Sequence, residues 1–323
     1  MGSEQTNGHG GANSIGGVGR SLSPARVPNF SLPTWLLSPA RVPNFSLPTW
    51  LLIPATIALL FILGPILALI LHIPWFRSWE LLTQPEALQT VGLSIRTALV
   101  ATGLCALLGF PLALALHHHG RNHRRWVAVV QVLVYAPLVL SPVVSGLALT
   151  FLWGRRGFLG QYLDQLGMPV TFTTSAVVIT QVFVALPFFV STVVIALRGI
   201  PLRFEELAAT EGATRWEVMW RVIIPLSLPG IAMGMILGFA RALGEYGATL
   251  TFAGNVAGIT RTIPLHIELG LSSNDMDRAL GAVIMLLAVY VLIIGAIGVI
   301  RMFSRQQPGQ PQSRQPGQSR QSR

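Results

Sequence analysis

The chain has 323 residues, of which 52% are hydrophobic and 11% charged, and its mean hydropathy is +0.61. This composition is far more apolar than that of a soluble domain, so it excludes an ordinary globular protein and predicts several membrane-spanning helices. The net charge of +10 indicates contact with anionic lipid rather than with nucleic acid. All 22 residues that are lysine or arginine are arginine. The lack of lysine excludes a P-loop lysine, so any ATP used must bind another subunit.

Residues 1–50 precede the first long apolar stretch. The first 21 residues are rich in Gly, Ser and Asn and are expected to be disordered. The sequence LSPARVPNFSLPTWL then occurs twice in succession, at 22–36 and 37–51. Two copies are too few to bury a core as a solenoid does. We therefore expect an extended, proline-rich segment at the membrane surface.

Six apolar stretches follow, each close to the ~20 residues that a helix needs to cross a bilayer. They lie at 51–72, 95–116, 127–152, 176–197, 229–252 and 279–300. Together they predict an all-α membrane protein with a six-helix transmembrane domain over residues 51–303. Prolines inside the spans, among them Pro137 and Pro142, predict kinks.

Arginines are unevenly distributed over the connections between these spans. Most of them fall on one side of the membrane if both termini are placed on that side. The positive-inside rule then predicts that the termini, the 117–125 loop and the 198–225 segment are cytoplasmic. The tail 304–323 is basic and rich in Gln, Pro and Ser, and is expected to be disordered near anionic lipid.

Between the fourth and fifth spans lies a polar segment, ELAATEGATRWEVMWRVIIP, at residues 206–225. A glycine at 212 and a proline at 225 predict two short helices around a glycine turn, lying against the membrane face. Glu217 and Arg221 are spaced for an i, i+4 ion pair. An ordinary amphipathic connector is the alternative interpretation.

The fifth span carries two charges, Arg241 and Glu245, one helical turn apart. Charge inside a membrane is costly, so a functional role is the first hypothesis. The arginine would line a pore and lower the barrier for an anion, or the pair would link two states of a gate. The third possibility is an internal pair that only fixes helix packing, which Gly238, Gly244 and Gly247 would make close.

The 206–225 segment resembles the cytoplasmic coupling motif of ABC importer permeases. It matches the spacing E-x-A-x3-G-x9-V-x-I-P and departs from the family pattern at Leu207 and Val222, both mild apolar replacements. The resemblance implies that the motif positions transmit force from an ATPase. These positions are Glu206, Ala208, Gly212, Val222 and Pro225.

A closer resemblance covers residues 50–303. The stretches 136–160, 181–190, 238–255 and 260–265 are similar to the molybdate-type branch of the oxyanion permeases. It implies a type I ABC importer permease fold in the bacterial cytoplasmic membrane. It also implies a permease homodimer, a cytoplasmic ABC ATPase dimer that binds ATP and Mg, and a periplasmic or lipid-anchored molybdate-binding protein.

The resemblance further implies a channel-forming subunit that is not itself an enzyme, has no cofactor of its own and imports molybdate. Sulfate or tungstate is the alternative cargo. A stand-alone secondary carrier is a rival class, but it predicts inverted repeats that the hydropathy does not show, and it leaves the coupling motif unexplained. No nucleophile–base pair or metal-ligand spacing lies at a membrane edge, so no catalytic or metal residue is predicted.

Overall fold

The computed structural model describes residues 49–83, 85–119, 124–201 and 203–305, and within these ranges the chain forms helices and no strand. It divides into two compact units, residues 1–65 and 66–323, and each is described by itself. The predictions for the proline-rich repeat up to residue 48 and for the tail beyond residue 305 lie outside the described residues.

Five helices are long and apolar enough to cross a membrane, and a bent pair of helices makes a sixth candidate. The five are α1 (Leu52–His72), α3 (Pro85–His119), α7 (Thr174–Arg198), the continuous stretch Arg215–Leu243 that ends with α10 (Ile224–Leu243), and α13 (Met276–Arg305). The bent pair is α4 (Arg124–Val139) with α5 (Pro142–Trp153). The prediction of an all-α membrane protein is confirmed, and the bent pair, counted as one span, brings the candidates to the predicted six.

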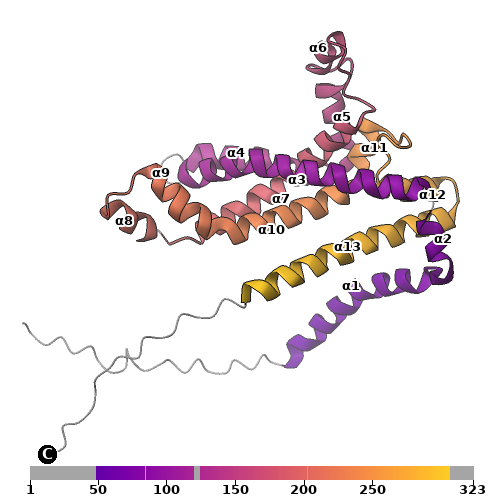
Figure 1. The fold of residues 1–323 in the computed structure, drawn as a ribbon, viewed down its shortest axis with the longest axis horizontal. Helices are drawn as coiled ribbons and strands as arrows, with labels where there is room; N and C mark the ends of the chain where they lie inside the picture. The colour runs from indigo at the N-terminus through magenta and orange to yellow at the C-terminus, as the bar shows by residue number, and fades with distance from the viewer. Residues whose placement is uncertain (1–48, 84, 120–123, 202, 306–323) are drawn as a thin grey trace, which may run out of the picture. The chain divides into compact units, whose positions relative to one another are not determined.

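Shorter helices connect these spans (Figure 1). They are η2 (Thr49–Leu51), η3 (Trp75–Arg77), α2 (Ser78–Leu82), α6 (Gly160–Gln165), α8 (Arg203–Thr210), α9 (Arg215–Val218), the π-helical turn η4 (Met219–Ile223), α11 (Gly247–Ala253) and α12 (Ile263–Ser272).

The predicted span at 127–152 is bent at Pro142, one of the prolines expected to kink a span, and it consists of two helices rather than one kinked helix. The chain turns by 115° between α4 and α5, and α5 leads away from the bundle towards α6 (Figure 1). Ser141 begins the new helix, because its hydroxyl accepts a hydrogen bond from the Val144 amide at 3.4 Å. Pro142 occupies the first turn, where its missing N–H costs nothing and where it cannot continue α4.

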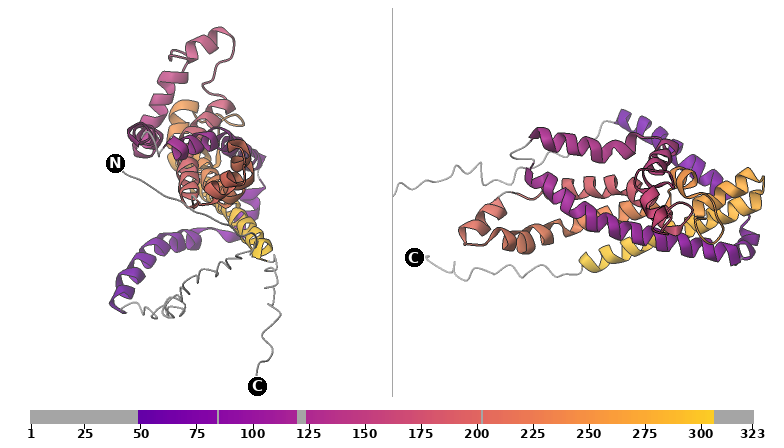
Figure 2. Two further views of the ribbon diagram at one scale, coloured as in Figure 1. Left: turned by 90° about the vertical axis from the view of Figure 1, so that its left-hand side faces the viewer. Right: turned by 90° about the horizontal axis from the view of Figure 1, so that it is seen from above.

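The core of the 66–323 unit forms where α3, α7 and α10 pack on one another (Figure 2). Phe189 of α7 is fully buried at their meeting point. A Cβ atom added at Gly109 of α3 would lie 2.7 Å from the Phe189 ring, and one added at Gly234 of α10 would lie 3.1 Å from it. Two glycines therefore leave the space that this ring fills, which is how apolar helices approach closely in a membrane.

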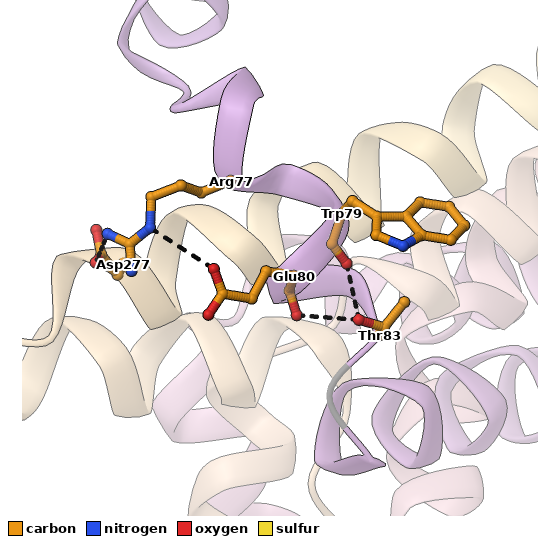
Figure 3. Close-up of polar contacts among 5 residues, drawn as sticks. All are labelled: Arg77, Trp79, Glu80, Thr83 and Asp277. Carbon is orange, nitrogen blue, oxygen red and sulfur yellow. Dashed lines mark hydrogen bonds and ion pairs between the residues drawn. The ribbon is translucent and has the colours of Figure 1, made fainter.

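The short helix α2 is fastened to the start of α13 (Figure 3). The Arg77 guanidinium donates to the Asp277 carboxylate at 3.0 Å and lies 3.9 Å from the Glu80 carboxylate. The Thr83 hydroxyl closes α2 by donating to the Trp79 carbonyl at 2.9 Å. Because the ionic groups are half exposed, each pair contributes at most about 1 kcal/mol, so the contact orients α2 more than it stabilises it.

Replacing the central ring tests this packing. Phe189→Ala should lower the free energy of unfolding by about 3 kcal/mol, because the glycine-lined space cannot collapse around a methyl group. Thermal unfolding of the purified permease in detergent measures the effect. Phe151→Ala, on the exposed side of α5, is the control and should change stability by less than about 1 kcal/mol. Equal effects of the two variants would contradict the proposed packing.

Candidate functional site

The predicted helix–turn–helix between α7 and α10 is present. After α8, Gly212 adopts a φ of +82°, a left-handed conformation that only glycine adopts without strain. The Ala213 amide donates to the Ala208 carbonyl at 3.0 Å and the Glu211 amide to the Leu207 carbonyl at 3.2 Å. The first bond spans the helix end in the manner of a Schellman motif, so this glycine both ends α8 and reverses the chain.

Reciprocal side-chain capping starts α9. The Glu217 carboxylate accepts from the Thr214 amide at 3.0 Å, and the Thr214 hydroxyl accepts from the Glu217 amide at 3.3 Å. The Arg221 guanidinium lies 3.5 Å from the same carboxylate, which confirms the predicted i, i+4 pair. The T-x-x-E spacing at 214–217 is a sequence signature of such a capping box, so this cap is a local property of the sequence.

The five motif residues lie along one continuous stretch from α8 to the start of α10. Glu206 is exposed on α8, Ala208 is half-buried, and Gly212 is exposed in the turn. Val222 is half-buried in the π-helical turn, and Pro225 is exposed in the first turn of α10. The segment that carries all five, from α8 to the start of α10, lies at one end of the bundle, away from α11 and α12 (Figure 1).

This polar stretch also presents large apolar side chains, which were not among the predicted site residues. Leu207, Trp216 and Trp220 are 64%, 63% and 53% exposed, and the two indole rings lie 5.5 Å apart edge to face. We call these three residues the tryptophan face. A groove of about 430 Å³ lies beside it, lined in part by Trp216, Met219 and Ile223. Exposed aromatic side chains beside a groove are typical of a protein interface.

Arg241 and Glu245 form an ion pair at the opposite end of α10, but not within one helix as predicted. The helix ends at Leu243, and Glu245 lies in the break before α11. The Arg241 guanidinium donates to one oxygen of the Glu245 carboxylate at 2.7 Å, and the Ala248 amide donates to the other at 3.0 Å. The carboxylate is 2% exposed, and each of its two oxygens has a partner inside the protein, as a buried charge requires.

The pair holds the junction where α11 packs against α5. A Cβ atom added at Gly247 would lie 2.6 Å from the Pro142 side chain, and one at Gly146 would lie 2.8 Å from the Ala248 carbonyl. These distances confirm the close packing expected at Gly247. The geometry is that of an internal pair in which the carboxylate is buried and the Arg241 side chain is 31% exposed.

Removing the arginine should destabilise the protein, and removing the glutamate as well should restore part of the lost stability. Arg241→Gln leaves a buried carboxylate without its counter-charge and should destabilise the protein by about 2–4 kcal/mol. Adding Glu245→Gln should restore at least half of this loss, because the buried charge is then gone. Thermal unfolding of the two single variants and the double variant measures the coupling.

The control is Arg278→Gln, which breaks a half-exposed pair with Asp275 (3.6 Å) and should cost less than about 1 kcal/mol. Strictly additive effects of the two single variants would show that Arg241 and Glu245 do not act as a pair.

Comparison with known proteins identifies the class. Residues 106–307 match the family described as the inner membrane component of binding-protein-dependent transport systems. The chain belongs to this family of multi-pass inner-membrane permeases, so it is a membrane component and not the ATPase of such a system.

Within the family, the chain is similar to permeases of molybdenum and sulfate transport systems. It is 43% identical over 240 residues to the molybdenum transport system permease protein ModB of Mycobacterium tuberculosis, covering 74% of this chain and 89% of that protein. It is 31% identical over 245 residues to the sulfate transport system permease protein CysT of Escherichia coli, covering 75% of this chain and 87% of that protein.

A solved structure shares the fold. A chain of a bacterial alginate ABC transporter, crystallised with an alginate-bound periplasmic protein, superposes with a TM-score of 0.59 and 22% sequence identity. The match covers 84% of this chain and 96% of that one. The expected ABC importer permease fold is confirmed.

Proposed function

We propose that this chain is the permease subunit of an ATP-driven importer that carries molybdate into the cytoplasm. The observation that carries the proposal is the 43% identity, over 74% of the chain, to a molybdenum transport permease. The identity to a sulfate permease over a similar length is lower, at 31%, and this difference favours molybdate over sulfate as the cargo. Sulfate and tungstate, which are also tetrahedral divalent oxyanions, are the alternative cargoes.

In the proposed orientation, both termini and the α8–α9 segment face the cytoplasm. The bias of the arginines towards that side supports it. A separate ATPase subunit, which binds ATP and Mg, docks on α8 and α9. The tryptophan face supports this docking, because exposed aromatic side chains on a segment outside the membrane are typical of the residues that contribute most binding energy to a protein interface. The motif residues Glu206, Ala208, Gly212, Val222 and Pro225 shape and present that surface.

Two copies of the permease form the pore between them in this proposal, and a binding protein delivers the anion from outside. ATP favours the outward-open state only to the extent that the ATPase dimer binds nucleotide more tightly in that state. The α8–α9 segment transmits movement of the ATPase dimer to the pore, because α10 continues directly from this segment. At the far end of α10, Arg241 offers a partly exposed positive charge to the anion while Glu245 fixes its position.

Transport by the reconstituted system tests the function. Proteoliposomes containing the permease, its ATPase and its binding protein should take up labelled molybdate only with ATP, even in excess sulfate. Gly212→Asp should reduce uptake at least tenfold at matched protein levels, because it strains the turn and adds a charge to the docking surface.

Gly167→Asp is the matched control, since Gly167 has a φ of +74° and the same open surroundings but lies in the loop after α6. It should keep more than half of the uptake. Uptake that needs neither ATP nor partners would replace the importer with a secondary carrier. Uptake abolished by sulfate would keep the importer and change its cargo.

The tryptophan face can be tested apart from transport. Trp216→Ala with Trp220→Ala should weaken binding of the ATPase subunit at least tenfold in a titration with purified components, because buried aromatic anchors carry much of an interface's energy. Trp79→Ala removes an indole that is 78% exposed on α2, at the other end of the bundle, and should leave the affinity unchanged. Unaltered affinity of the double variant would place the ATPase elsewhere.

A further inference from the structure

A pocket of about 410 Å³ lies between the first half of α3 and the loop that joins α11 to α12. We infer that this pocket binds a tetrahedral oxyanion, held by the guanidinium of Arg96 and the amide of Gln89. The inference rests on the orientation and the cargo class proposed above. Its lining residues are Leu88, Gln89, Gly92, Leu93, Arg96 and Gly258.

Arg96 is an exposed arginine on a helix that is otherwise apolar enough to cross the membrane. Among the residues that the structure describes, no carboxylate forms an ion pair with it. A guanidinium facing acyl chains is costly, so this side chain requires a polar environment or an anion. Arg96 is the charged residue among the described residues that line the pocket.

The length of α3 puts this arginine at the membrane boundary. Its 35 residues extend over about 52 Å, whereas the hydrocarbon core is about 30 Å thick. The helix therefore projects from the bilayer on at least one side. A span of ~20 residues counted back from Leu116 ends close to Arg96. In the proposed orientation the pocket lies on the outer side, where a binding protein would release its anion.

The opposite wall of the pocket is preformed by a tightly bonded loop. The Thr260 hydroxyl accepts from the Val256 amide at 2.8 Å and donates to the Gly254 carbonyl at 3.1 Å, and the Thr260 oxygen is buried. This turn holds Gly258 at a φ of +72°, facing Gln89 of α3. A Cβ atom at Gly258 would lie 3.8 Å from the Gln89 side-chain oxygen and would narrow the pocket.

The chemistry of the lining suits a compact oxyanion. Gln89, Gly92 and Arg96 follow one another at i, i+3 and i+7, so they share one face of α3. The planar guanidinium offers two parallel N–H groups to two anion oxygens, and the Gln89 amide offers a further donor. The two glycines leave room for the anion beside the guanidinium.

Two sources can supply such a ligand: a free oxyanion on its way to the pore, or the phosphate of a lipid headgroup at the membrane boundary. The test therefore measures both in one preparation. The permease–ATPase complex in nanodiscs, without binding protein, is titrated with labelled molybdate, and the lipid that co-purifies with the complex is quantified by phosphorus analysis and mass spectrometry. The variant is Arg96→Gln, which keeps the shape of the side chain's stem but removes its charge.

Arg156→Gln is the matched control, since Arg156 is also exposed, lies in the loop after α5 and does not line this pocket. We expect Arg96→Gln to weaken molybdate binding at least tenfold, as for the loss of a charge-assisted bond, and Arg156→Gln to change it less than twofold. Loss of bound anionic lipid in Arg96→Gln alone, with molybdate binding unchanged, would assign the site to a headgroup phosphate. If Arg96→Gln changed neither molybdate binding nor the amount of bound lipid, the inference would be overturned.

A second readout separates this inference from the proposed function. ATP-dependent uptake by the wild-type complex with its binding protein is measured on the same preparation. Normal molybdate uptake together with unaltered binding in Arg96→Gln would reject the pocket and keep the importer. Uptake of sulfate in place of molybdate would change the cargo, and the titration would then be repeated with labelled sulfate.

Discussion

Close packing of α3, α7 and α10 is the constraint on which the rest of the structure depends. Lipid tails are as apolar as leucine, so these helices gain little from hiding apolar surface from one another, and they associate through shape. Phe189 fills the space beside Gly109 and Gly234, and Gly230 of α10 faces Ala196 of α7. These contacts hold the end of α7 beside the start of α10, and the α8–α9 segment therefore leaves and re-enters the bundle at neighbouring points.

The helix α10 joins the two functional regions of the molecule. Its 20 residues extend over about 30 Å, with the capped α9 and the π-helical turn before its first residue and the Arg241–Glu245 pair at its last turn. The Glu245 carboxylate also accepts from the Ala248 amide in the first turn of α11, which packs through Gly247 on the first turn of α5. A displacement of α9 along the axis of α10 would thus act on the α5–α11 contact through covalently continuous helix and one buried carboxylate.

Much of this arrangement follows from local sequence, and the exceptions have physical causes. Long apolar runs predicted the spans, and Gly212 predicted the turn because its left-handed conformation is a local property. The prolines predicted a kink at this position, but proline alone does not explain why the helix breaks here, since Pro111 and Pro187 lie inside unbroken helices. What distinguishes Pro142 is Ser141 before it, which supplies a cap for a new helix.

Other features of the site depend on tertiary contacts that no local pattern contains. The i, i+4 spacing of Arg241 and Glu245 suggested one helix, but Gly244 ends that helix, and the pair survives because the chain folds back towards the guanidinium. The pocket at Arg96 needs Gly258 from a distant loop. The exposure of Trp216 and Trp220 depends on which face of a short helix the bundle covers.

The π-helical turn at Met219–Ile223 has a consequence for how this segment tolerates changes in length. A π turn contains one residue more than an α turn, and the helix on either side keeps its register. A chain one residue shorter within this turn would close an ordinary α turn there and leave every contact of α10 in place. The same deletion a few residues later would rotate α10 by about 100° and turn Gly234 away from Phe189. Natural length variation is therefore expected to be admitted at this turn and excluded from the helix that follows it.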